Sequence, residues 1–362
     1  MKRQNQGSKF MLFILTWAIV FMMLMMFILG VISVFIPIDL DGVLMSPWAI
    51  VVNQLGIFIL PLAMWTTAKG EQMWASIPKN PLGGKNILIL VALSILLQPL
   101  MMTLSGVSSL FFNNDVAELM YSFQQHPFWL QILAIAVTPA ICEELVFRGY
   151  LQSKYRAHTI KQAAFINGLF FAFMHMNFQQ FAYTFVLGVI FAYMVHYTRS
   201  IWAGILPHFI VNASQVALSR VVLAMEEPVA EEVYLAGLSV EMQGLLYIAG
   251  LALVLMPVVV ILFRALIKHN RERAPEWAGW DNAAPLPETV NTMPEWASFT
   301  GDASAGPPVM PGAPNMPDMP EPMPGAPEPE LEEKPWSSLF DPVALWVIVV
   351  YALFMAFITW VT

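Results

Sequence analysis

Long apolar stretches separated by short polar loops occupy most of the chain, and this pattern predicts membrane-spanning helices. A helix needs about 20 mainly apolar residues to cross a hydrocarbon core of about 30 Å, because each residue adds about 1.5 Å. The first stretch is expected to be a span rather than a cleaved signal peptide, because it is too long and no small-residue cleavage site follows it. The nine predicted spans are residues 10–36, 48–68, 87–110, 128–150, 162–178, 181–197, 201–219, 242–266 and 340–361.

The composition favours the same class of protein. Hydrophobic residues make up 58% of the chain and charged residues 12%, against roughly half and a quarter in ordinary soluble domains. We therefore expect an all-α fold, a polytopic transmembrane helical bundle of about 8–9 spans in the lipid bilayer. The single cysteine excludes a disulfide framework or a Cys-based zinc cluster. With 17 Lys and Arg against 25 Asp and Glu, a basic surface for nucleic acid is not expected.

Basic residues lie on alternate loops, and this asymmetry predicts the orientation. Lys and Arg collect on cytoplasmic loops of membrane proteins, and here they precede the first span and follow the second, fourth, sixth and eighth. We therefore expect an integral membrane protein with a cytoplasmic N-terminus and, after nine spans, a C-terminus outside. A bacterial plasma membrane is the expected location.

Residues 275–335 have a different composition. This segment holds 15 of the 27 prolines and has a net charge of −10, against −8 for the whole chain. It has too little apolar surface to offset the entropy lost on ordering. We expect a disordered acidic linker in the cytoplasm, whose partner the sequence does not identify.

Ionisable residues within the predicted spans cluster in the fourth to the seventh, and each is costly there unless it has a partner or a function. In the fourth span Glu144 and Arg148 are four residues apart, a spacing that suits an ion pair on one helical face. Glu143 points about 100° away, so Arg148 cannot easily neutralise both carboxylates. Two adjacent carboxylates at this depth favour a function over a purely structural pair.

Two further spans carry histidines. If the fourth and fifth spans form a hairpin that turns near Thr159, a good helix-starting residue, Glu143 lies 16 residues before the turn and His175 lies 16 after it. Both would then lie at about the same depth, roughly 24 Å from the turn. In the seventh span His208 and Asn212 share one face, although Asn212 could equally hydrogen-bond a neighbouring helix.

A carboxylate, two imidazoles and an amide that converge within a membrane cavity suit hydrolysis by an activated water. Glu143 could take a proton from water, and histidine and asparagine donors could stabilise an oxyanion. The chain contains neither a Gly-x-Ser-x-Gly elbow nor a His-Glu-x-x-His zinc motif. Carboxylates beside Cys142 would raise its pKa, so Cys142 is not expected to be a nucleophile.

These motifs resemble those of the CAAX-protease and bacteriocin-processing (CPBP, or Abi) family of intramembrane proteases, over roughly residues 130–216. The resemblance implies an endopeptidase that cleaves membrane-associated peptide or protein substrates, of the prenylated-CAAX type or small peptides. It implies no cofactor in the glutamate-protease branch, with zinc as the alternative under the family's metalloprotease label. The residues that carry the resemblance are Glu143, Glu144, Arg148, Phe171, His175, Gly188, Thr198–Trp202, His208 and Asn212.

The resemblance also implies a role for each site residue. Glu143 would activate water with the help of His175, whereas His208 and Asn212 would form the oxyanion site. Glu144 and Arg148 would shape the site, and no metal ligand is assigned. The expected parts of the chain are N-terminal helices (1–126), the catalytic core (127–219), a loop and eighth span (220–274), the linker (275–335) and a last helix (336–362).

Two other functions agree with the same residues. A catalytically silent scaffold or bacteriocin-immunity factor would keep the fold and tolerate loss of Glu143. A proton-coupled transporter would use the carboxylates and histidines as a proton relay, and inverted repeats would favour it, but the sequence has no convincing repeat.

Overall fold

The computed structural model describes residues 6–156, 158–224 and 239–273, together with positions 339, 342–346, 348–349 and 352. Within these residues the chain is helical apart from its loops and one isolated bridge. The helices are α1 (Gln6–Phe35), α2 (Leu40–Leu44), α3 (Pro47–Gln54), α4 (Leu60–Ala68), α5 (Gly84–Leu96), α6 (Gln98–Ser109), α7 (Asp115–Ser122), α8 (Phe128–Gln131), α9 (Thr138–Glu144), α10 (Gln152–Lys154), α11 (Ile160–Met174), α12 (Phe178–Thr198), α13 (Trp202–Ala224) and α14 (Val240–Arg273).

Seven helical stretches of the described chain are long and apolar enough to cross a membrane. They confirm the prediction of an all-α polytopic bundle. The fifth predicted span, 162–178, differs from the structure, because its helix α11 has only 15 residues and ends before His175. The ninth, 340–361, lies mostly outside the described residues, and the predicted linker 275–335 lies wholly outside them.

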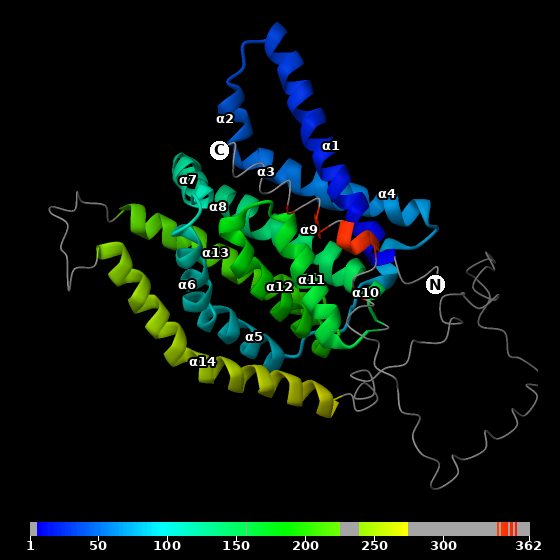
Figure 1. The fold of residues 1–362 in the computed structure, drawn as a ribbon, viewed down its shortest axis with the longest axis vertical. Coiled ribbons are helices and arrows are strands. Elements are labelled where there is room, and N and C mark those ends of the chain that lie inside the picture. Colours follow the sequence, from blue (N-terminus) through cyan, green and yellow to red (C-terminus); the bar gives the residue numbers. More distant parts are fainter. Residues whose placement is uncertain are drawn as a thin grey trace, which may run out of the picture.

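The helices α9 to α13 form the centre of the molecule (Figure 1). The N-terminal helices α1, α3 and α4 cover one side of this centre, and α5, α6 and α14 cover the other. This arrangement places the fourth to seventh predicted spans, which carry the ionisable residues, between two layers of apolar helices.

The hairpin of α11 and α12 begins and turns as its local sequence dictates. Thr159 caps α11 in a capping box with Gln162, which satisfies two backbone donors that the first helical turn leaves free. Met176 adopts a left-handed conformation with φ of 48° after the last turn of α11, and the Asn177 side chain accepts hydrogen bonds from two backbone N–H groups of α12. The turn therefore leaves few polar backbone groups unpaired, as a membrane environment requires.

Two glycines bring α11 and α12 close together. A Cβ atom on Gly188 would lie 2.6 Å from the Cα atom of Gly168, closer than packed atoms allow. Small residues at such crossings let backbones approach and gain van der Waals contact, which drives helix association where lipid removes the hydrophobic difference. The crossing also fixes the carbonyl of Gly188, which the site uses.

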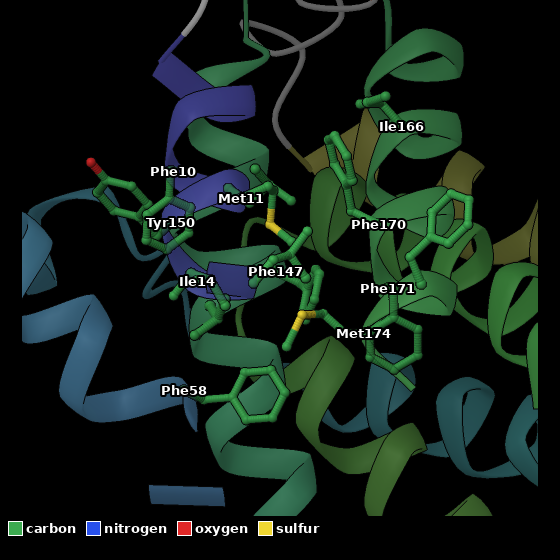
Figure 2. Close-up of a cluster of buried hydrophobic side chains, with 14 of the residues drawn as sticks. Phe10, Met11, Ile14, Phe58, Phe147, Tyr150, Ile166, Phe170, Phe171 and Met174 are labelled. Atoms are coloured by element: carbon green, nitrogen blue, oxygen red, sulfur yellow. The ribbon is translucent and has the colours of Figure 1, made fainter. Parts of the chain in front are cut away.

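A cluster of buried aromatic and aliphatic side chains joins α1 to the central helices (Figure 2). Phe10 packs on Tyr150 with ring centroids 4.5 Å apart, and Phe147 meets Phe171 edge-on at 5.1 Å. Leu339 and Ala344, from the part of the C-terminal segment that the structure describes, are buried in the same cluster. The cluster fixes the segment that carries Glu143 and Glu144 on the side facing α1.

Contacts between distant loops gather the basic ends of the spans at one end of the bundle. Lys154 forms an ion pair with Glu71 at 2.7 Å, and Lys79 forms an antiparallel bridge with Ser200. Asn86 and Asn270 exchange side-chain hydrogen bonds at 2.9 and 3.0 Å. The loops that the charge pattern groups together are therefore neighbours, whereas the assignment of this end to the cytoplasm stays a prediction.

Candidate active site

The carboxylates lie on the continuous helical stretch Phe128–Lys154, which departs from regular α-helix on both sides of them. Residues Ile132–Val137 and Leu145–Leu151 are π-helical, and α9 with Glu143 and Glu144 lies between them. A π-helical turn shifts the side chains that follow around the helix and is frequent at functional sites. The two carboxylates are 5% and 0% exposed.

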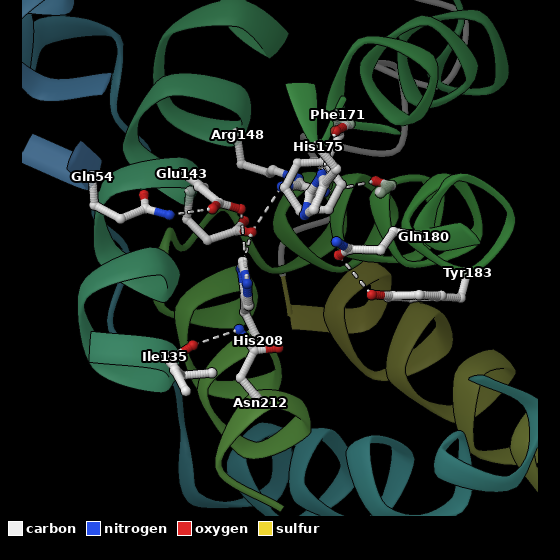
Figure 3. A network of polar contacts seen from close by, with 12 residues as sticks. Gln54, Ile135, Glu143, Arg148, Phe171, His175, Gln180, Tyr183, His208 and Asn212 are labelled. Carbon is white, nitrogen blue, oxygen red and sulfur yellow. Dashed lines mark hydrogen bonds and ion pairs between the residues drawn. The ribbon is translucent and has the colours of Figure 1, made fainter. Parts of the chain in front are cut away.

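Glu144 has two partners in a buried polar network, Arg148 and His208, which are both labelled in Figure 3. Its Oε1 accepts a hydrogen bond from Arg148 Nη1 at 2.7 Å and lies 3.0 Å from Nδ1 of His208. The ion pair confirms the prediction drawn from the four-residue spacing. Because the Arg148-bound carboxylate is an acceptor, Nδ1 of His208 carries the proton in this bond.

The Arg148 guanidinium is 1% exposed and is enclosed by the central helices. Its Nη2 donates to the carbonyl of Gly188 at 3.1 Å, and its Cζ lies 4.4 Å from the ring centroid of Phe171 and 5.5 Å from that of Phe191. Aromatic faces stabilise a desolvated cation more strongly than an exposed one. The charge of Arg148 is thus neutralised by Glu144 and held by the α11–α12 hairpin.

Glu143 has different partners. Its Oε1 accepts a hydrogen bond from Nε2 of Gln54 at 2.9 Å, and its Oε2 lies 3.9 Å from Nε2 of His208. That Oε2 is buried without a hydrogen-bond partner. The carboxylate is therefore held by one oxygen, whereas the other faces the second nitrogen of His208.

His175 lies beside this network but does not contact Glu143. Its Nδ1 is 2.8 Å from the carbonyl of Phe171, and because a carbonyl only accepts, this nitrogen carries the proton. The Phe171 ring contacts both histidines, with centroid separations of 4.9 Å to His175 and 5.9 Å to His208. Of the two histidines, His208 therefore lies nearer to Glu143, whereas the sequence analysis paired Glu143 with His175.

Asn212 replaces a hydrogen bond that is missing from the backbone of the carboxylate-bearing helix. Pro139 has no N–H, so it cannot donate to the carbonyl of Ile135 four residues earlier. Asn212 Nδ2 donates to that carbonyl at 2.9 Å, and one turn before it His208 reaches Glu144. His208 and Asn212 lie on the same face of α13, as expected. Together they hold α13 against the carboxylate-bearing stretch, at Glu144 and at Ile135.

Sequence reasoning missed two residues of this site. Gln54, which holds Glu143, comes from α3, and its only signal was a polar amide inside an apolar stretch. Gly204 lies so close to Glu144 that a Cβ atom there would meet Oε2 and would lie 3.0 Å from Cδ of that carboxyl group. A glycine near the start of a helix gave no signal of this contact.

The alternative of a bound zinc ion does not fit these donors. Glu144 Oε1 already accepts from Arg148 and from His208, so it could bind a metal only by giving up both bonds. In the parts of the chain that the structure describes, no group of three or more His, Cys, Asp or Glu side chains could hold one metal ion.

The fold and the buried carboxylate–histidine network define an integral membrane protein with a candidate hydrolytic site. Residues 125–214 match the model of the Rce1-like family, described as type II CAAX prenyl endopeptidase Rce1-like. The chain therefore carries an Rce1-like domain, which confirms the resemblance drawn from the three motifs. No curated protein and no solved structure gives a significant match to the chain.

Proposed function

We propose that the protein is an intramembrane endopeptidase that hydrolyses peptide bonds of membrane-associated substrates, either prenylated-CAAX-like proteins or small peptides. One observation carries the proposal: the buried Oε2 of Glu143 has no hydrogen-bond partner and lies 3.9 Å from Nε2 of His208. The Rce1-like match over the same helices supports this class of reaction.

The separation between Glu143 and His208 suits one bridging water. At 3.9 Å the two atoms are too far apart for a direct hydrogen bond, and one water could bridge them. With Nδ1–H of a neutral His208 bound to Glu144, Nε2 is an acceptor, as is Glu143 Oε2. A water between them would donate both hydrogens and turn its lone pairs towards a substrate carbonyl.

Hydrolysis then needs one proton carrier and one oxyanion donor. As the water oxygen bonds to the carbonyl carbon, Glu143 takes one water proton and the carbonyl oxygen becomes an oxyanion. When the intermediate collapses, the C–N bond breaks and Glu143 returns the proton to the leaving nitrogen. Asn212 uses one N–H on Ile135, so its second N–H can serve the oxyanion. His208, expected from the sequence at the oxyanion site, here accepts from the water instead.

Glu144 and Arg148 act through His208 in this mechanism. The Glu144 carboxylate fixes which nitrogen of His208 carries the proton, as an orienting carboxylate does in other hydrolytic sites. Arg148 neutralises Glu144 at 2.7 Å, which leaves Glu143 as the carboxylate able to exchange protons. We therefore assign Glu144 and Arg148 as positioning residues.

Replacement of Glu143 by Gln tests the proposal. Gln keeps the shape but cannot take a proton, so membrane-peptide turnover should fall by roughly 100-fold or more, while the protein accumulates normally. The measurement is the peptide content of membranes from cells with native or Glu143→Gln protein, matched for expression. Processing at the native rate by the variant would show that Glu143 is not the base and would favour a silent scaffold.

Metal removal is a separate prediction. A site that uses Glu143 as the base should keep its rate when purified protein is treated with a strong chelator, because the proposed steps need no metal. The initial rate on one substrate before and after chelation, followed by addition of zinc, checks this expectation. Loss of activity that zinc restores would contradict metal-free catalysis.

A further inference from the structure

A cavity lies where several spans end, and several basic side chains line it. It has a volume of about 60 Å³ and lies between the α10–α11 turn, the end of α12 and the loop at residues 76–78. Its basic lining residues are Arg148, Arg156, His158, His196 and Arg199. Among the described residues that line it there is no Asp or Glu.

We propose that this cavity binds a phosphate group. At roughly 10–15 Å³ for each water-sized position, a cavity of this volume holds about four to six heavy atoms, which is enough for a tetrahedral oxyanion such as phosphate. Arginine donors in a fork match phosphate oxygens in pairs. Basic pockets between the ends of membrane helices are suited to lipid headgroups, so an anionic phospholipid is the expected source, with free phosphate as the other.

The backbone conformation of Arg199 is a second observation at this cavity, and it does not depend on charge. It ends α12 in the left-handed conformation, with φ of 54°, at a position where glycine is preferred because a side chain costs energy there. Its carbonyl accepts a hydrogen bond from the N–H of Asn80 at 3.0 Å, and the adjoining Ile201 donates to Pro78 at 2.8 Å. The backbone is therefore fixed at this wall of the cavity, and the strained position holds an arginine.

Arg148 and Arg156 both line the cavity, and they differ in exposure. Arg156 is exposed at the rim, where its Nη2 donates to the carbonyl of Ser76 at 3.3 Å. Arg148 is the lining residue that also reaches Glu144, and its Nε is buried without a partner. An unpaired buried donor costs free energy, and an anion bound in the cavity that Arg148 lines could offset this cost. The cavity is separate from Glu143, so this inference does not depend on the proposed protease activity.

The test uses purified full-length protein in vesicles of phosphatidylcholine with or without phosphatidylglycerol. Lipids that survive detergent extraction are identified by native mass spectrometry, and binding of inorganic phosphate to delipidated protein is measured in parallel. We expect the native protein to retain phosphatidylglycerol. Its affinity for this lipid should fall about fivefold for each arginine removed, in Arg156→Gln and then in Arg156→Gln/Arg199→Gln. Arg156→Gln alone is informative if the double variant does not fold, because this side chain is exposed.

Arg264→Gln is the matched control, because it removes an exposed positive charge from α14 and leaves the cavity unchanged. Retention of phosphatidylglycerol by native protein and by this control, but not by Arg156→Gln, would support a lipid headgroup. Binding of inorganic phosphate with the same dependence on Arg156, without lipid retention, would support free phosphate. Equal retention by Arg156→Gln and native protein, or binding of neither compound, would overturn the proposal.

Discussion

At the residue scale, Gly204 shows how little room the buried network has. The carboxylate of Glu144 lies against this glycine, and its other oxygen is held by Arg148 and His208. A methyl group at position 204 would have to displace a carboxylate that its partners prevent from moving. The absence of a side chain there is thus part of the site.

We predict that Gly204→Ala destabilises the protein by about 1–3 kcal/mol, the usual cost of overpacking, and lowers activity with it. The measurement is thermal unfolding of purified protein in detergent, alongside turnover. Gly244→Ala is the control, because a Cβ atom at that helical position meets nothing within 4 Å. If Gly204→Ala is as stable as the control, the contact with Glu144 is looser than the structure indicates.

The sequence predicted some residue contacts and not others for a simple reason. Glu144 and Arg148 are one helical turn apart, so their spacing alone brought them together. Gln54 and Glu143 are 89 residues apart, and their contact depends on where α3 packs. The hairpin argument predicted only that Glu143 and His175 lie at equal depth. It could not predict that His208 lies nearer to Glu143 than His175 does, because that depends on how the helices pack.

At the scale of the elements, the joint between α13 and the carboxylate-bearing stretch can be tested by double substitution. Asn212→Ala should cost about 1–3 kcal/mol, because the carbonyl of Ile135 loses its donor in a buried site. Pro139→Ala restores a backbone N–H near that carbonyl. We therefore predict that Pro139→Ala/Asn212→Ala is more stable than the sum of the single changes implies.

A double-mutant cycle of unfolding free energies in detergent measures this coupling. Purely additive effects would show that Asn212 and the proline defect are independent. The sequence suggested both features, a proline within a span and an asparagine that could bond a neighbouring helix, but not that one completes the other. It did predict the start of α11 at Thr159, because a capping box is a local signal.

At the scale of the whole molecule, the orientation in the membrane is the main prediction still to be tested. The loops after the second, fourth, sixth and eighth spans carry most of the basic residues, and contacts such as Lys154–Glu71 gather two of these loops at one end of the bundle. A reporter fused after Arg199 should be cytoplasmic, and one after Thr362 should be outside. A cytoplasmic reporter at Thr362 would mean that the number of spans is even.

The shortness of α11 has a consequence for access to the carboxylates. Its 15 residues extend only about 22 Å, so the turn at His175 and Met176 stops several ångströms short of the far side of an average hydrocarbon layer. Because α11 is buried along most of its length, neighbouring helices rather than lipid surround the end of this short helix. The short helix therefore reduces the distance over which a water or a polar peptide must leave its hydration shell to reach the carboxylates from that side.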